Sequence, residues 1–350
     1  MITLVNQIAG QTTNGLNDFI TVKSADDADI AELFHQKTGN LTVDARYGLR
    51  LIVAALIPHR SLKGLFSACP APDHPFFAIA EKYRRDQIWS VLGPPLLRNS
   101  ASCNPAQWLP DDAFRQLASC QSPAPDFTSP RLGFMFETLW QDALTTFGLP
   151  HLSNLQIQQN GRTLGELDLI LQQSDPAQHI ELALKFYLGI GSDWVGPNLR
   201  DLLSRKIRHT FDHQLPLASA PAARAVLDAK GIHRCDSAAL MRGCLFHPAH
   251  GLTPAPLPAE VSPHHWSGYW CPVGDAGSCL PEGRWYVLSK PDWLSPVLAK
   301  FSVSRADLLQ YLASYFRHLS TPISIALVME GPYGWAEHQR WMIVSDHWLD

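Results

Sequence analysis

Two short runs of residues near the middle of the chain alternate between polar and apolar side chains, and this pattern restricts the fold most. The runs span 163–171 and 178–187, and six polar or turn-forming residues that include Pro176 separate them. Alternation over this length is typical of half-buried strands. Asp and Pro in the connection suit a hairpin loop. The two runs therefore predict an antiparallel β-hairpin in which Leu171 lies opposite Gln178.

This register predicts a close pair of carboxylates. Counting back along the hairpin puts Asp168 opposite Glu181, and directly paired side chains lie about 5 Å apart. Lys185 shares the strand face of Glu181, because side chains on one face recur at every second residue. Two carboxylates at this distance repel one another unless a cation or a proton lies between them. We therefore take this pair as the centre of a candidate site.

The segment before the hairpin, 132–147, predicts an amphipathic helix. Seven apolar side chains recur in it at helical spacing, and Glu137 lies at the margin of the apolar stripe, where its carboxylate can face neighbouring strands. A further strand is expected over 155–159, and Asn160-Gly161 directly after it favours a tight hairpin turn. The expected order is therefore one helix followed by three strands.

A second helix with basic side chains is expected after the hairpin. Pro197 suits its first turn, and apolar residues continue at helical spacing as far as Phe211. Basic side chains on a helix can face phosphate groups, although a solvated helix face explains the same pattern equally well. The candidate nucleic-acid contacts in this segment are Arg200, Arg205, Lys206, Arg208 and His209.

The composition is that of an ordinary globular protein. The 350 residues are 46% hydrophobic and 17% charged, which fits a chain of about two domains. A net charge of −4 gives no global nucleic-acid signature, so a polyanion would have to meet a local patch. Seven scattered cysteines fit a reducing compartment better than a disulfide framework. Because neither a signal peptide nor a membrane-spanning stretch is visible, we expect a cytoplasmic protein without membrane contact.

Taken together, these segments resemble the PD-(D/E)XK nuclease superfamily. They place an acid on the first helix, Asp on the second strand, and Glu followed by Lys on the third. Four segments are similar to a bacterial family known as a domain of unknown function, number eighteen fifty-three: 131–133, 164–168, 179–188 and 194–201. Weaker similarity extends this resemblance over about residues 85–350.

The resemblance implies an α/β (α+β) fold with a nuclease-like core over 126–215. The core would be a helix followed by a hairpin-rich mixed sheet and a second helix. Residues 1–125 would form a mostly helical N-terminal extension, and 216–350 an α+β region that could complete the same sheet. Seven of the 11 tryptophans lie in the last 85 residues, where a buried core explains them better than base stacking does.

The resemblance also implies a metal-dependent phosphodiesterase, an endo- or exonuclease that acts on nucleic acid, with DNA as the expected substrate. Mg²⁺ or Mn²⁺ held by carboxylates would activate water and neutralise the phosphate. Asp168 and Glu181 would be metal ligands, with Glu137 as an accessory ligand or water-positioning residue. Lys185 would orient the attacking water. It lies about 13 Å along the strand from Glu181 instead of the usual 6.6 Å or so, and Ala183 occupies the usual position.

Three other interpretations are open at this point. Glu181 and Lys185 could form an ion pair without any chemistry. Ala183 at the usual lysine position favours a noncatalytic nucleic-acid-binding or assembly protein that keeps the fold. Four potential zinc ligands occur at a spacing that matches no common zinc finger: His233, Cys235, Cys244 and His247.

Overall fold

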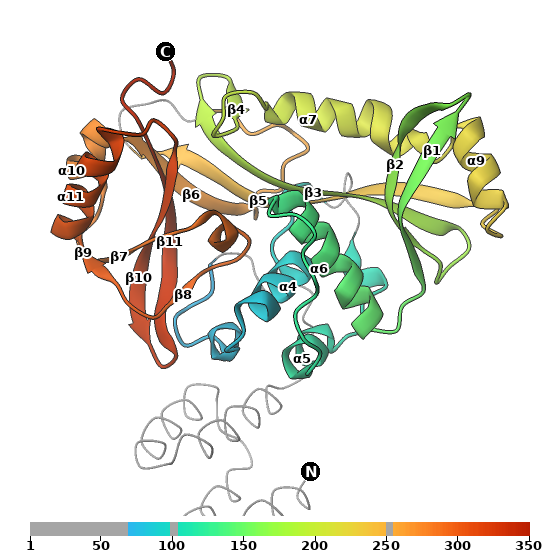
Figure 1. Ribbon diagram of the computed structural model, residues 1–350, viewed down its shortest axis with the longest axis horizontal. Coiled ribbons are helices and arrows are strands. Elements are labelled where there is room, and N and C mark those ends of the chain that lie inside the picture. The colour runs from blue at the N-terminus through green and yellow to red at the C-terminus, as the bar shows by residue number, and fades with distance from the viewer. Residues whose placement is uncertain (1–68, 99–103, 250–254) are drawn as a thin grey trace, which may run out of the picture. The chain divides into compact units, whose positions relative to one another are not determined.

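One mixed β-sheet runs through the described part of the chain (Figure 1). The computed structural model describes residues 69–98, 104–249 and 255–350, which all belong to one compact unit. Within these residues, eleven strands form a single sheet in the order β1-β2-β3-β5-β6-β11-β10-β7-β9, with β4 beside β3 and β8 beside β11. The expected α/β class is therefore confirmed in its coarse form. The expected domain boundaries stay predictions, and residues 1–68 and 99–103 of the N-terminal extension lie outside the described residues.

The described elements have the following bounds. The strands are β1 His151–Gln159, β2 Arg162–Leu171, β3 Ala177–Ile190, β4 Asp193–Val195, β5 Cys235–Pro248, β6 Trp266–Pro272, β7 Arg284–Val287, β8 Leu298–Ala299, β9 Val303–Ser304, β10 Ile323–Gly331 and β11 Gly334–Val344. The main helices are α4 Lys82–Leu92, α5 Ala113–Ser119, α6 Leu132–Thr146, α7 Leu203–His209, α8 Leu215–Leu217, α9 Pro221–Asp228, α10 Ala276–Cys279 and α11 Arg305–Phe316, with a π-helix over Thr210–Gln214. In these residues, no helix is long and apolar enough to cross a bilayer.

Parallel strands form the centre of the sheet and antiparallel strands form its two sides. Strands β3, β5, β6 and β11 pair in parallel, whereas β1, β2 and β3 form one antiparallel series and β11, β10, β7 and β9 form another. Parallel neighbours need a crossover connection. The helices α7 to α9 supply it between β3 and β5, and this crossover positions the basic helix over the hairpin.

Strand β5 was not expected from the sequence. Eight consecutive residues from Ala239 to Phe246 are buried in it, so its side chains do not alternate between polar and apolar. Gly243 lies in the middle of the strand with a φ of +133°, and an added Cβ would lie 1.6 Å from the Lys185 carbonyl oxygen. Only glycine permits this close approach of the two strands.

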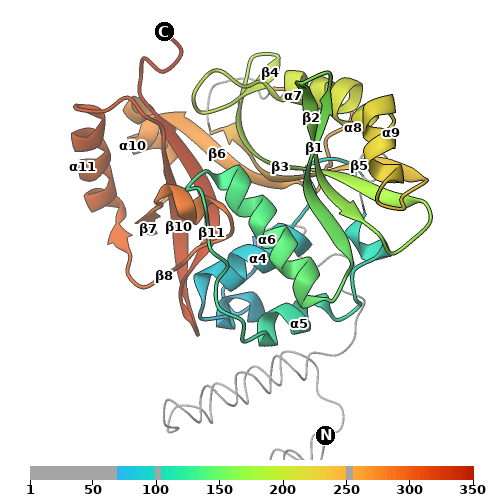
Figure 2. The same cartoon turned by 45° about the vertical axis from the view of Figure 1, so that its right-hand side comes forward.

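Helices cover both faces of the sheet, as Figures 1 and 2 show for β3 and β5. Helices α4, α5 and α6 pack on one face, where Leu169, Leu182 and Met342 belong to their core. On the other face, α7 and α9 cover the part with β1 to β5, and α10 and α11 cover the part around Trp341. The sheet therefore separates α6 from α7, and the candidate site draws residues from both helices.

The elements around the hairpin agree closely with the sequence analysis, with one correction. Helix α6 ends at Thr146, and Asn160 and Gly161 form the expected turn with φ values of +51° and +75°. The expected helix start at Pro197 is wrong, because α7 begins only at Leu203. The segment before it is a loop that Leu199 turns with a φ of +62°.

A buried ion pair joins Glu337 and Arg340 in β11. Both side chains are fully buried, and Arg340 Nη2 lies 2.6 Å from Glu337 Oε2. Residues three apart in a regular strand point to opposite faces. The register between β10 and β11 shifts here, so that His338 is an extra residue between Glu337 and Gln339. This β-bulge brings the two charges onto one face.

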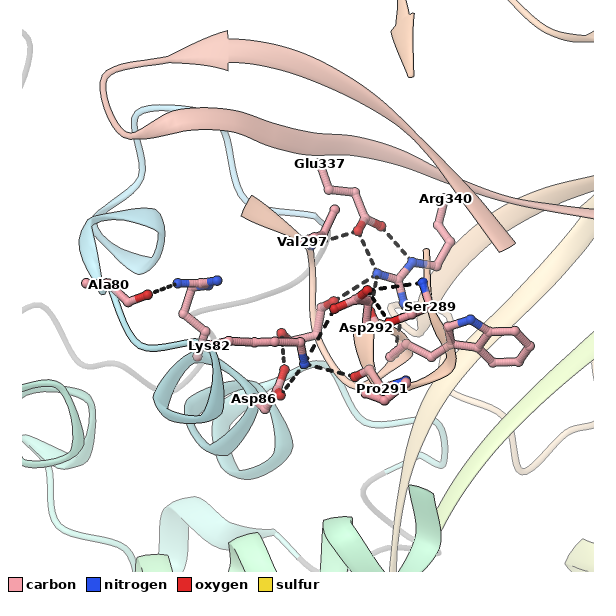
Figure 3. Close-up of polar contacts among 12 residues, drawn as sticks. Ala80, Lys82, Asp86, Ser289, Pro291, Asp292, Val297, Glu337 and Arg340 are labelled. Atoms are coloured by element: carbon pink, nitrogen blue, oxygen red, sulfur yellow. Dashed lines mark hydrogen bonds and ion pairs between the residues drawn. The ribbon is translucent and has the colours of Figure 1, made fainter. Parts of the chain in front are cut away.

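The guanidinium of Arg340 also organises the loop before β8. It lies 4.3 Å from the ring centroid of Trp266, and Glu337 in turn accepts the N–H of Val297 at 2.8 Å. Figure 3 shows the contacts of Glu337 with Val297 and Arg340, and those of Arg340 with this loop. Arg340 donates hydrogen bonds of 2.8–3.2 Å to three backbone carbonyls of this loop, those of Asp292, Trp293 and Ser295.

Helix α4 attaches to the same loop (Figure 3). Lys82 forms an ion pair with Asp86 at 2.6 Å and donates a hydrogen bond to the Pro291 carbonyl at 2.9 Å. The Ser295 hydroxyl donates to the second oxygen of Asp86 at 2.6 Å. A helix near residue 85 and a strand near residue 340 therefore share one buried polar network.

Trp348 closes the loop that precedes α7. Its indole N–H donates to the Pro197 carbonyl at 3.0 Å across 151 residues of sequence, and its ring lies 5.9 Å from that of Trp270. The interpretation of the tryptophan-rich region as buried core is confirmed for five of its seven tryptophans: Trp266, Trp270, Trp285, Trp341 and Trp348.

The Glu337–Arg340 pair generates a stability prediction. Arg340→Met should destabilise the protein by about 3–5 kcal/mol, because it leaves an unpaired carboxylate in a dry interior. The double variant Arg340→Met/Glu337→Leu should recover much of that loss. Urea unfolding of the wild type and both variants measures the effect. A single variant that is no less stable than the double variant would contradict the prediction.

Candidate acidic site between the hairpin and two helices

The two hairpin strands separate at the predicted carboxylate pair. Strands β2 and β3 pair over three positions, from Leu171 opposite Gln178 to Leu169 opposite Ile180, which confirms the expected register. Beyond that point, the Asp168 carboxylate accepts the backbone N–H of Leu182 at 2.9 Å. The Asp168 side chain thus takes the place of a backbone acceptor in β2. The two strands stop pairing here and separate, and we call this point the fork.

Asp168 and Glu181 approach one another in this fork closely enough to interact directly. Burial is the largest cause that raises the pKa of each carboxyl group above its usual value, and the charge of Asp168 raises the pKa of Glu181 further. Glu181 is 3% exposed, and its Oε2 is buried without a hydrogen-bond donor. The sequence-predicted pair is therefore brought together, and one oxygen of Glu181 has no donor.

Glu137 joins the pair from helix α6. Burial, followed by repulsion from Asp168 and Glu166, raises the pKa of Glu137 to about 7. Asn154 of β1 hydrogen-bonds to Glu137, and its amide donates to Glu166 at 2.9 Å. Glu137 is therefore the third acid of the site, as the stripe of α6 predicted, and Asn154 connects it to the edge strand.

The helical segment after the hairpin provides one cation close to this site. Lys206 Nζ lies 3.8 Å from Glu181 Oε1, and the Lys206 side chain is only 14% exposed. Burial lowers its pKa, while the charge of Glu181 opposes that effect. Gln214 donates its amide to the same oxygen of Glu181. One oxygen of Glu181 is thus covered by the helical segment, and the other faces no donor.

Lys185 is directed to a different carboxylate. Its ammonium lies 2.6 Å from Asp201 Oδ2, which also accepts the Tyr187 hydroxyl at 3.0 Å. The ion pair with Glu181 considered from the sequence is therefore wrong, since Lys185 pairs with Asp201 instead. The catalytic role expected for Lys185 stays a prediction.

The remaining basic residues of the expected contact surface lie outside the site. Lys206 points inward, whereas the other four side chains expected to contact nucleic acid are exposed: Arg200, Arg205, Arg208 and His209. Three of the five belong to the last turn of α7. The exposed cations therefore lie on the same helical segment as the lysine that approaches Glu181.

The donor set suits a hard divalent cation. Carboxylate oxygens are the preferred ligands of Mg²⁺, which is commonly held by one or two carboxylates and completes its shell with water and phosphate. The donorless oxygen of Glu181 beside Asp168 fits such an ion. In the part of the chain that the structure describes, no three His, Cys, Asp or Glu side chains form a ready metal site. Asp168 and Glu181 therefore suit a divalent cation that is held by two carboxylates.

The zinc interpretation is wrong. Cys235 and Cys244 lie in the same strand, β5, nine residues and thus about 30 Å apart. His233 instead contacts Asp228, and His247 packs on Trp194. These four potential ligands therefore cannot hold one ion.

Several parts of the site were not found from the sequence. Lys206 was expected to face nucleic acid or solvent with its neighbours, and Gln214, Asn154 and Glu166 were assigned no role. The late start of α7 and the π-helix determine which residues of this segment point at Glu181. Pro216 is one available signal, because it lacks the N–H that a regular helix would bond to the Asp212 carbonyl.

The fold and site define an α/β protein with a buried acidic centre. The chain belongs to the family described as Domain of unknown function (DUF1853), which matches residues 85–344. The match includes α6, the hairpin, α7 and the strands up to β11, so it covers the whole candidate site. No curated protein and no solved structure matches the chain.

The raised pKa of Glu137 generates a pH prediction. An unfolded glutamate titrates near 4.5, so the folded state binds this proton more tightly, and stability should fall as the pH rises from 4.5 to about 7. Glu137→Gln should reduce that fall by about 1 kcal/mol, a value lowered for solvent screening. Urea unfolding from pH 4.5 to 8 measures the slope. Glu260→Gln at an exposed position is the control, and equal slopes in the two variants would contradict the prediction.

Proposed function

We propose that this protein is a Mg²⁺-dependent nuclease of PD-(D/E)XK type that hydrolyses phosphodiesters in DNA. One observation carries the proposal: Glu181 has a buried oxygen without a donor, and its carboxylate interacts with that of the half-buried Asp168. Proteins rarely keep an unpaired buried carboxylate for stability, because desolvating a charge is costly. Such strongly perturbed acids are typical of functional sites.

The order of elements supports the same superfamily. Helix α6, strands β1 to β3 and helix α7 follow one another as the resemblance implies. The acids lie on the implied elements, with Glu137 on α6, Asp168 on β2 and Glu181 on β3. The fork between β2 and β3 gives both strand acids access to one ion.

The residues of the site suit the chemistry of phosphodiester hydrolysis. A bound Mg²⁺ would lower the pKa of a coordinated water and offset charge on the phosphate. Asp168 and Glu181 would hold the ion. Glu137, with a pKa of about 7, can accept a proton from water at neutral pH. The exposed Arg205 and Arg208 can bind neighbouring phosphates of the strand and thereby orient it.

Cleavage of nucleic acid tests the proposal directly. The wild type should cut single-stranded, duplex or branched DNA in the presence of Mg²⁺ or Mn²⁺. Asp168→Asn should lower the rate by at least about 100-fold, because the ion loses a ligand. The matched control is Asp228→Asn, an exposed residue on α9. Equal cleavage by Asp168→Asn and wild type would assign the activity to another site or a contaminant.

Thermal stability tests the metal site without any substrate. Mn²⁺ at a hundredfold excess over its dissociation constant should stabilise the wild type by about 2.7 kcal/mol, since it binds only the folded state. Asp168→Asn should lose this increment, and the variant without metal should be as stable as the wild type or more so, because repulsion in the fork is relieved. Differential scanning calorimetry measures both values. The same metal response in both proteins would argue against the carboxylate pair.

A noncatalytic DNA-binding protein is the second candidate. It is favoured by the engagement of Lys185 with Asp201 and by the contacts that already cover one oxygen of Glu181. In that case DNA binding should weaken with salt but should not change with EDTA or Asp168→Asn. The reverse pattern favours the nuclease.

A further inference from the structure

Three side chains of one helical segment form a cluster on Glu181 Oε1. Gln214 donates its amide to this oxygen, and Lys206 Nζ lies 3.8 Å from it. Lys206 also donates to Gln214 Oε1 at 2.7 Å, and the Thr210 hydroxyl donates to the same amide oxygen at 3.0 Å. The amide of Gln214 is thus held on its oxygen side while its nitrogen side holds Glu181.

The π-helix creates this geometry. Lys206 and Gln214 are eight residues apart, and in an unbroken α-helix they would be offset by about 80° around the axis. The wider turns over Thr210–Gln214 accommodate one extra residue, which reduces the offset to about 20°. Both side chains can therefore reach the same carboxylate. π-turns within helices often occur at functional sites.

We propose that Lys206 and Gln214 form an internal cation lock, in which the lysine ammonium takes the place of a divalent cation at Glu181 and must leave when that ion binds. The inference rests on the proposed function, because it uses the same two carboxylates as the metal site. The free Oε2 of Glu181, a residue that is 3% exposed, provides the second coordination point toward Asp168.

Lys206 fits this role and Lys185 does not. Lys185 is bound to Asp201 at 2.6 Å, so its charge is already matched by another carboxylate. Lys206 has only a 3.8 Å contact with Glu181 and shares that oxygen with Gln214. When it is displaced, Lys206 would join the exposed cations Arg205 and Arg208 of α7. Occupation of the metal site would then add a charge to the surface that meets phosphate.

Binding of Mn²⁺ alone, followed by electron paramagnetic resonance of the free ion, tests the lock. Lys206→Met should bind Mn²⁺ more tightly by on the order of tenfold, within the range typical of coupled binding. Gln214→Leu should shift the affinity in the same direction, since the ammonium then loses its hydrogen-bond partner. Lys206→Arg keeps the charge and should stay close to the wild type. Lys230→Met, at an exposed position after α9, is the control and should leave the affinity unchanged.

The outcomes separate the lock from the nuclease. Unchanged or weaker Mn²⁺ binding by Lys206→Met overturns the lock. Equal tightening in Lys230→Met overturns it too, as does the absence of binding in wild type and variant alike. Mn²⁺ binding by Lys206→Met but not by the wild type supports it. If Lys206→Met does not fold, Lys206→Gln repeats the measurement with a donor kept toward Gln214. A wild type that binds Mn²⁺ but cleaves no DNA overturns the proposed nuclease and leaves the lock intact.

Discussion

The parallel pairing of β3 with β5 is the contact on which the described fold depends. Twelve residue pairs connect the two strands, from Ala177 opposite Cys235 to Leu188 opposite Phe246. On one side of this ladder lies the hairpin with its acids, and on the other lie β6 and the antiparallel strands that follow it. Gly243 allows β5 to approach Lys185 closely. The acidic site is therefore built on a strand that pairs with β2, β4 and β5.

Two buried glutamates, Glu337 and Glu181, differ in how their carboxylate oxygens are satisfied. In β11, Glu337 receives a guanidinium and a backbone N–H, so each of its oxygens has a partner. In the fork, Glu181 has one oxygen without a donor and a second carboxylate beside it. The first arrangement satisfies both oxygens of the carboxylate, and the second leaves one oxygen without a donor. The oxygen of Glu181 that has no donor can still accept a hydrogen bond or coordinate a cation.

The hairpin and its carboxylates could be predicted because local rules determine them. Strand parity, the Asn160-Gly161 turn and the apolar stripe of α6 were enough to bring Glu137, Asp168 and Glu181 together. The inward position of Lys206 could not be predicted. It depends on a loop that makes α7 begin only at Leu203, and on a π-helix that changes which side chains of the segment point to the sheet. Strand β5 was not predicted for another reason. A strand that is buried on both faces does not alternate between polar and apolar side chains. The nuclease assignment and the domain boundaries stay predictions.

The hydrogen bond from Trp348 to Pro197 has a consequence for how the site is assembled during synthesis. Translation proceeds from the N-terminus, and a chain that has just emerged with its hairpin lacks the residue that closes the loop before α7. The partner of Pro197 lies 151 residues further along the chain and emerges only after them. Long-range closures of this kind slow folding. The loop before α7 therefore receives its closing contact late in synthesis, after the strands from β5 to β11 have emerged.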